Sequence, residues 1–298
     1  MLKSLGFRRA VDARRDSHPK VQAYFQGRLD PHRSAQLSPL LDRFGDQLFD
    51  VMERTLDQMM ALAPELGVSS TETSDVQAFM TGLFEKTGAL PHDQDFEAFE
   101  EVVERFYTQP IYPFLEHSMF LHPVGLERLA RVRQLVEGLS PTRLADVAVG
   151  PAAIFSALLE TFPDAKGAAF DISPPCVAYA RKVLARGGWD RRAEVTEADA
   201  RELPVPAAAY DCVVATEVVE HVPNPEVLVG ELARVLEPAG TLIVSVPLSL
   251  PWGAHLAVFG SQAEAEALFA EAFTLEAFET VPFEKGASLC FGRFQRKG

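Results

Sequence analysis

The spacing of hydrophobic residues changes character near Ser140-Pro141. Before this point, apolar residues recur every three to four positions, which is the period of an amphipathic helix, and no segment shows the alternation of a strand. Residues 1–139 are therefore predicted to form an all-α domain. Its predicted helices cover 40–59, which Ser38-Pro39 would open, 76–84 behind Ser74, 96–106, and 126–136 with Pro123 near its start.

After Pro141, short β-rich runs alternate with segments of helical period. Strands separated by helix-length connections predict a parallel sheet that helices cover on both faces. The last two runs are joined by a turn near Lys285-Gly286, which predicts a hairpin that adds an antiparallel edge. The predicted strands are 144–149, 167–172, 193–198, 210–216, 240–247, 273–281 and 287–295. We therefore expect an α/β domain with seven strands over residues 140–298.

The composition is that of a globular protein with a sizeable core, because 47% of the 298 residues are hydrophobic and 23% are charged. No apolar stretch approaches the ~18 residues that a membrane span needs. The formal net charge of −14 argues against a nucleic-acid partner, which would require a positive surface. Cys176, Cys212 and Cys290 lie far apart, which excludes a disulfide scaffold and suits a reducing, cytoplasmic compartment.

Ligands of open α/β sheets bind beyond the carboxyl ends of the strands, so the residues at these ends are the candidates for chemistry. The first strand runs into Asp146-Val-Ala-Val-Gly150-Pro-Ala152, where small residues let backbone N–H groups approach a ligand. The second strand ends at Asp171, about 20 residues after Gly150. A carboxylate at this spacing can accept hydrogen bonds from both hydroxyl groups of a ribose.

The first of these segments resembles the D-x-G-x-G-x-G motif of class I S-adenosylmethionine-dependent methyltransferases. Asp146 matches the acidic position and Gly150 matches the middle glycine. Ala148 and Ala152 stand where the family has its first and third glycines. Alanine does not readily adopt a positive φ, so we expect this departure to affect the affinity or the pose of the cofactor.

Later segments match the same family in the same order. Asp171-Ile172-Ser173 resembles its ribose-binding D-I-S, residues 197–200 resemble its G-D-A segment, whose acid meets the adenine amino group, and residues 236–240 resemble its L-K-P-G-G turn. The resemblance implies a Rossmann-like, seven-stranded methyltransferase sheet that binds S-adenosylmethionine. The residues expected to bind it are Asp146, Ala148, Gly150, Asp171, Ile172, Asp199, Ala200 and Thr216. A nicotinamide dinucleotide fold would leave the segments at 199–200 and 220–223 unexplained.

The fourth and fifth strands lead to a second group of side chains. Glu217, Glu220 and His221 would share one face of a helical turn, and His255 follows the fifth strand. The E-x-x-E-H spacing resembles that of ubiquinone-pathway O-methyltransferases and small-RNA 2′-O-methyltransferases, which implies a divalent metal held by these four residues. Metal-free relatives share E-H-V-P-D-P at this point. In those relatives the histidine is commonly a structural or orienting residue. A further alternative is that His221 or His255 is a general base for the acceptor.

The resemblance implies an enzyme that moves a methyl group to a small-molecule acceptor, at oxygen rather than nitrogen, such as a phenolic or secondary metabolite. The helical domain would cap the cleft, select the acceptor or form a homodimer. Three alternatives stay open: a SAM-fold binding or regulatory subunit without activity, which the alanines at 148 and 152 motivate, a SAM-fold enzyme with other chemistry, and methylation of a protein or peptide.

Overall fold

The computed structural model describes residues 2–14, 16–26, 31–66, 98–251, 253–283 and 286–298. The predicted helix over 76–84 lies outside these residues. The described part divides into two compact units, one of helices and one built around a sheet. None of its helices combines the length and the apolar composition that crossing a bilayer requires.

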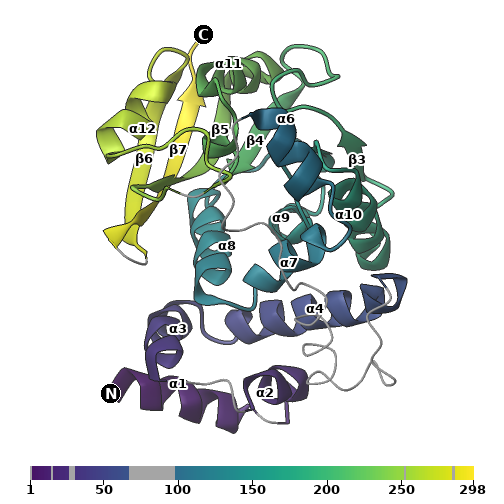
Figure 1. Ribbon diagram of the computed structural model, residues 1–298, viewed down its shortest axis with the longest axis vertical. Helices are drawn as coiled ribbons and strands as arrows, with labels where there is room; N and C mark the ends of the chain where they lie inside the picture. Colours follow the sequence, from purple (N-terminus) through teal and green to yellow (C-terminus); the bar gives the residue numbers. More distant parts are fainter. Residues whose placement is uncertain (1, 15, 27–30, 67–97, 252, 284–285) are drawn as a thin grey trace. The chain divides into compact units, whose positions relative to one another are not determined.

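The sheet has seven strands in the order β3-β2-β1-β4-β5-β7-β6, which confirms the predicted α/β class (Figure 1). The strands β1 to β5 run parallel, and β7 is antiparallel to both β5 and β6. Their bounds are Arg143–Val147 (β1), Lys166–Asp171 (β2), Ala193–Glu197 (β3), Tyr210–Thr216 (β4), Leu236–Leu248 (β5), Phe273–Pro282 (β6) and Ser288–Arg296 (β7). The strand order reverses beside β1, so the carboxyl ends of β1 and β4 flank the position where such sheets bind ligands.

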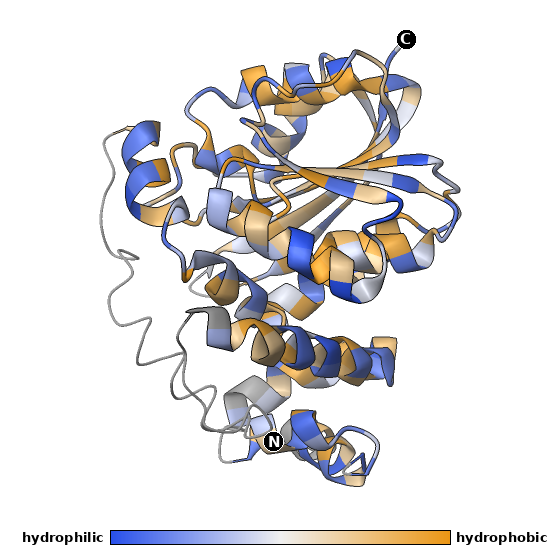
Figure 2. Ribbon diagram, turned by 90° about the vertical axis from the view of Figure 1, so that its right-hand side faces the viewer, coloured by the Kyte–Doolittle hydropathy of each residue, from blue (hydrophilic) through white to orange (hydrophobic). Residues whose placement is uncertain are grey.

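Helices follow β1, β2, β4 and β5, because connections between strands of one direction need crossovers of this length. They are α9 (Ala153–Thr161), α10 (Pro174–Gly187), α11 (Pro225–Val235) and α12 (Gln262–Phe269). The central strands are almost entirely buried, and Figure 2 shows their apolar residues in orange between the helices. Cys176, Cys212 and Cys290 are all buried free thiols, which agrees with the absence of a disulfide framework.

The helical unit holds α1 to α4 and most of α7 and α8. Their bounds are Leu2–Ala13 (α1), Pro19–Phe25 (α2), Pro31–Phe44 (α3), Gln47–Leu62 (α4), Tyr112–Met119 (α7) and Pro123–Leu135 (α8), with the 3-10 turn η1 (Ala63–Leu66) after α4. The single long helix that we predicted over 40–59 is split, and Pro39 lies inside α3 instead of opening a helix. Gly45 causes the break, because its left-handed backbone (φ 54) ends α3.

A short helical segment from the N-terminal half packs with the sheet unit instead of the helical unit. It consists of α6 (Phe99–Val102) and the π-helix η2 (Val103–Tyr107), and Phe99 of α6 is part of the main hydrophobic core of the sheet unit. Residues 131–139 also belong to the sheet unit. The division of the structure therefore differs from the single boundary at 139/140 that the change in periodicity indicated.

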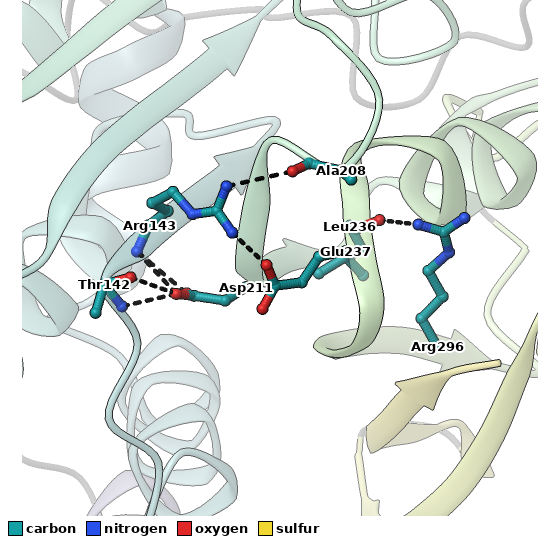
Figure 3. A network of polar contacts seen from close by, with 7 residues as sticks. All are labelled: Thr142, Arg143, Ala208, Asp211, Leu236, Glu237 and Arg296. Atoms are coloured by element: carbon teal, nitrogen blue, oxygen red, sulfur yellow. Dashed lines mark hydrogen bonds and ion pairs between the residues drawn. The ribbon is translucent and has the colours of Figure 1, made fainter. Parts of the chain in front are cut away.

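A polar network ties together the amino ends of β1 and β4 (Figure 3). The Asp211 carboxylate accepts hydrogen bonds from the backbone N–H (2.9 Å) and hydroxyl (2.7 Å) of Thr142 and from the backbone N–H of Arg143 (3.1 Å). The guanidinium of Arg143 continues the network to the Ala208 carbonyl and the Glu237 carboxylate. These contacts hold the strands in register at the end opposite to their ligand-binding edge.

We predict that Asp211→Ala lowers the free energy of unfolding by about 2–3 kcal/mol, because it removes several charge-assisted hydrogen bonds at once. Chemical denaturation with fixed pH and salt measures this change. The matched control is Asp190→Ala at an exposed position, for which we expect a change of at most about 0.5 kcal/mol. Equal effects of the two substitutions would contradict the role of the network.

Candidate functional site

All eight predicted cofactor residues lie at the carboxyl edge of four neighbouring parallel strands. They end or follow β1, β2, β3 and β4, which are adjacent in the sheet. These residues are Asp146, Ala148, Gly150, Asp171, Ile172, Asp199, Ala200 and Thr216. Residues that the sequence separates by up to about 70 positions are thus brought to one edge, as the topology of a parallel sheet requires.

The loop between β1 and α9 has a left-handed backbone at alternate residues. Ala148, Gly150 and Ala152 have φ values of 63°, 51° and 61°. An L-residue in this region costs roughly 1–2 kcal/mol, so the two alanines keep a backbone shape that glycine would adopt without strain. The loop therefore adopts, at two alanines, a backbone conformation that glycine favours.

Gly150 is the one position of this alternating set at which the chain has kept a glycine. Because Ala148 and Ala152 adopt similar φ values, the left-handed backbone alone does not demand glycine at 150. Packing does not demand it either, since a Cβ atom built on Gly150 meets no other protein atom within 4 Å. The space beside Gly150 is therefore open to a ligand that approaches the backbone.

Asp171 joins this loop to the end of β2. Its Oδ2 accepts the backbone N–H of Gly150 (2.8 Å), and its Oδ1 accepts the backbone N–H of Ser173 (2.9 Å). Burial raises the pKa of Asp171 to about 6, although the two N–H groups act in the opposite direction. Above that pH the group is a carboxylate with two oxygens fixed in orientation, which is an acceptor for paired hydroxyl groups.

Asp146 is a second buried acid on the adjacent strand and is only 3% exposed. Burial raises its pKa well above the usual range, and the nearby charge of Asp171 raises it further. Two acids held together in this way are stabilised by any cationic ligand that comes close to them. The electrostatics of the site thus favour a positively charged ligand group.

Asp199 follows β3 and is held by the side chain of Arg201. The guanidinium Nε lies 3.0 Å from Oδ1 and its Nη2 lies 2.6 Å from Oδ2, while the backbone N–H of Arg201 also donates to Oδ1 at 2.8 Å. Partial burial alone would raise the pKa of Asp199, but these hydrogen bonds and the charge of Arg201 together lower it. Asp199 is therefore an ionised acceptor with a fixed orientation.

The predicted helical turn after β4 does not form as expected. Glu217 has a left-handed backbone (φ 51), and a 3-10 turn, η3 (Val219–His221), begins two residues later. The Glu217 carboxylate instead accepts a hydrogen bond from the Ser245 hydroxyl at 2.7 Å. Among the described residues, one atom each from Glu220, His221 and His255 lie within 4.8 Å of one another, so the structure groups three of the four expected metal ligands and leaves Glu217 outside.

The two imidazole rings are oriented by backbone carbonyl groups. His221 Nδ1 lies 2.9 Å from the Ala254 oxygen, and His255 Nδ1 lies 2.8 Å from the Leu250 oxygen. Since a carbonyl only accepts, both Nδ1 atoms carry the proton, and Nε2 carries the lone pair in the neutral ring. Burial lowers the pKa of His255, which keeps this ring neutral at pH 7 despite the nearby charge of Glu217.

The sequence reasoning missed Tyr107 and Arg201 as parts of the site. The Tyr107 ring meets the His221 ring edge-on at 5.8 Å, and its backbone oxygen accepts the Ser173 hydroxyl at 2.6 Å. Tyr107 lies in an aromatic-rich run of the sequence between residues 106 and 120, a pattern that is common in core packing as well as in ligand pockets. The signal for Arg201 is the cation two residues after the predicted adenine-binding acid.

Comparison with known proteins identifies the class. A family profile described as a methyltransferase domain matches residues 145–244. The demethylmenaquinone methyltransferase of Thermus thermophilus is 36% identical over 105 residues, which are 35% of this chain and 47% of that protein. The phosphatidylethanolamine N-methyltransferase of Cereibacter sphaeroides is 33% identical over 138 residues (43% and 68%). The ubiquinone biosynthesis O-methyltransferase of Xanthomonas euvesicatoria is 31% identical over 175 residues (57% and 68%).

The fold also matches solved structures. The [4+2]-cyclase SpnF superposes with a TM-score of 0.52 at 17% identity, over 59% of this chain and 82% of that chain, which shows a shared fold alone. The alignment with the first relative spans about half of that protein's length. The chain belongs to the class I S-adenosylmethionine-dependent methyltransferases, a family of enzymes. The resemblance seen in the sequence is thus confirmed.

We predict that Gly150→Ala lowers the affinity for S-adenosylhomocysteine at least about tenfold while it lowers the free energy of unfolding by only about 1–2 kcal/mol. The methyl group would project into the open space beside the loop. Gly188→Ala is a matched control, because Gly188 also has a left-handed φ (71) and open space but ends α10. Calorimetric titration of both variants tests this, and an equal loss of affinity in both would contradict it.

We also predict that the affinity for S-adenosylhomocysteine is constant above pH 7 and falls below pH 6. The pKa of Asp171 is about 6, and protonation removes one of its acceptors for the ribose hydroxyl groups. The affinity should then decrease about tenfold per pH unit at most, with proton release on binding. In Asp171→Asn the weaker binding should lose this pH dependence, and an unchanged profile in that variant would assign the effect to another group.

Proposed function

We propose that the chain transfers the methyl group of S-adenosylmethionine to a hydroxyl group of a small-molecule acceptor. The observation that carries this proposal is the position of His221 and His255. Both follow strands whose carboxyl ends lie at the edge that carries the cofactor residues. The family defines the cofactor, and the imidazole pair at the same edge supplies groups that can act on an acceptor.

In the proposed site, each strand end has a separate task. Asp171 accepts hydrogen bonds from the hydroxyl groups of the ribose, and Asp199 accepts one from the amino group of the adenine. The loop around Gly150 lies against the amino-acid end of the cofactor. Asp171, whose pKa is about 6, carries a negative charge at neutral pH, and a cationic group of the cofactor near it would also favour ionisation of Asp146, whose pKa burial raises. When bound, S-adenosylmethionine supplies an electrophilic methyl group on a sulfonium.

The transfer is a single displacement. The acceptor oxygen forms a bond to the methyl carbon, the bond between that carbon and sulfur breaks, and its electron pair stays on sulfur in S-adenosylhomocysteine. The proton of the acceptor hydroxyl passes to Nε2 of His255 or His221, whose Nδ1–H groups are held by carbonyl oxygens. The protein contributes mainly by alignment and by placing this base.

The relatives support a small-molecule acceptor, because two of them are named for quinone pathways. Oxygen is favoured over nitrogen because the O-methyltransferase aligns over 57% of the chain, whereas the N-methyltransferase aligns over 43%. A hydroxyl group also benefits more from a neutral imidazole, since it must lose its proton to become a strong nucleophile. The identity of the acceptor is left to the experiment.

The test uses S-adenosylmethionine with a deuterated methyl group and a metabolite extract containing phenols and amines. We expect a labelled small-molecule product with the methyl group on oxygen. We predict that His255→Gln and His221→Gln lower kcat by about 10²–10⁴-fold for whichever ring is the base. The affinity for S-adenosylhomocysteine should change less than about threefold, since neither ring is assigned to the cofactor.

His122→Gln, in the helical unit, is the matched control and should leave kcat unchanged. Full activity in both His221 and His255 variants would contradict the base. Binding of S-adenosylhomocysteine without any labelled product would favour a binding subunit or other chemistry, and label found only in protein would favour a protein acceptor.

A second candidate places a divalent metal at the same histidines. Two imidazole nitrogens and one carboxylate, from His221, His255 and Glu220, suit a metal of borderline hardness such as Zn²⁺. The Nδ1–H bonds to carbonyl oxygens are typical of the outer contacts of metal-bound histidines. A metal there would lower the pKa of the acceptor hydroxyl. Exhaustive chelation separates the candidates, because the general base predicts full activity and the metal predicts its loss and recovery with Zn²⁺.

A further inference from the structure

The segment Phe99–Tyr107, formed by α6 and η2, precedes the first strand of the sheet by more than thirty residues, yet it packs at the carboxyl edge of that sheet. Its central residues Val102 and Phe106 are buried in a cluster with Ala254, and Ile172 packs against this cluster. The segment therefore contacts Ile172, which follows the proposed ribose-binding Asp171, and Ala254, whose carbonyl orients His221. A π-helix such as η2 is an uncommon element that often occurs at functional sites.

One end of the segment is fastened beside Asp171. The Ser173 hydroxyl donates to the Tyr107 backbone oxygen at 2.6 Å and accepts the N–H of Cys176 at 3.2 Å, where it caps α10. The backbone N–H of the same serine donates to Asp171 Oδ1 at 2.9 Å. Ser173 is 1% exposed. Its buried hydroxyl holds Tyr107 and caps α10, while its peptide N–H holds Asp171.

The other end is fastened beside Asp199. The Arg201 guanidinium lies over the Phe99 ring, with 4.5 Å between its central carbon and the ring centroid. The same guanidinium forms the paired hydrogen bonds to both carboxylate oxygens of Asp199. Phe99 is 8% exposed and packs into the main core of the sheet unit. Stacking and ion pairing on one planar side chain are the combination that arginine provides and lysine does not.

These contacts give the segment the same two attachment points as the proposed adenosyl site. We propose that Phe99–Tyr107 forms a wall of that site and that Ser173 and Arg201 are positioning residues that couple the wall to cofactor binding. The inference rests on the proposed function, because it takes Asp171 and Asp199 as the acids that meet ribose and adenine. A ligand that fixes these two acids also fixes their partners Ser173 and Arg201, and thereby both ends of the segment. By reciprocity, loss of either attachment weakens the binding of the ligand.

The experiment measures amide hydrogen exchange of the full chain with and without S-adenosylhomocysteine, together with its Kd by calorimetry. In the wild type we expect the ligand to slow exchange in 99–107 at least about tenfold. In Ser173→Ala and Arg201→Met we expect the Kd to rise about 3–10-fold and the slowing in 99–107 to be largely lost. Arg201→Lys keeps the charge and should recover part of the affinity.

Two controls match these substitutions. Ser118→Ala removes a buried serine that donates within α7, and Arg191→Met removes one positive charge from an exposed position. Both should behave as the wild type. Ser173→Ala also removes a helix cap, so thermal unfolding first confirms that it is folded, and Arg201→Met carries the test if it is not.

The outcomes distinguish failure of the proposed function from failure of the proposed coupling. If the wild type does not bind S-adenosylhomocysteine, the proposed function fails. If it binds, but Arg201→Met keeps the wild-type Kd and the wild-type slowing of 99–107, the coupling is refuted while the function stands. A tighter Kd in Arg201→Met would also refute it, because Arg201 would then obstruct the acid that it is proposed to position.

Discussion

The structure of the site depends on the carboxylate of Asp171 and the backbone N–H groups that it accepts. One oxygen fixes Gly150 at the turn after β1, and the other fixes Ser173 at the start of α10. Because Ser173 also holds Tyr107, a single buried acid links the glycine turn, a helix cap and the upstream segment. Charge-assisted hydrogen bonds of this kind are strong where water is excluded, so the arrangement is already in place before a ligand arrives.

This preorganisation comes at the expense of stability. Burial raises the pKa of both Asp146 and Asp171, which means that the fold holds their ionised forms unfavourably near neutral pH. A fold selected for stability alone would place an amide or an apolar residue there. Asp199 shows the other solution, because Arg201 stabilises its charge directly. No cation of the described residues lowers the pKa of Asp146 or Asp171, and the cationic groups of the cofactor would provide that stabilisation.

The sequence predicted the seven strands within a few residues because strand and helix periods differ sharply after Pro141. It also predicted which acids share an edge, since the carboxyl ends of parallel strands must meet. The sequence did not predict two features of the structure. Spacing of i, i+3 and i+4 places side chains on one face only if the backbone is helical, and the left-handed Glu217 breaks that premise. The docking of Phe99–Tyr107 on the sheet is a tertiary contact, and an amphipathic pattern states that a face is buried without stating against what.

The alanines at glycine positions bear on whether the site is intact. Ala148 and Ala152 in the first loop and Ala239 in the turn before the central part of β5 all have φ between 61° and 63°. In each case the backbone has a conformation that glycine favours. The rest of the fold offsets the strain of roughly 1–2 kcal/mol per residue. The alanines therefore affect stability rather than the geometry of the site, so the loop keeps the shape that ligand binding requires in an active enzyme and in a binding subunit alike.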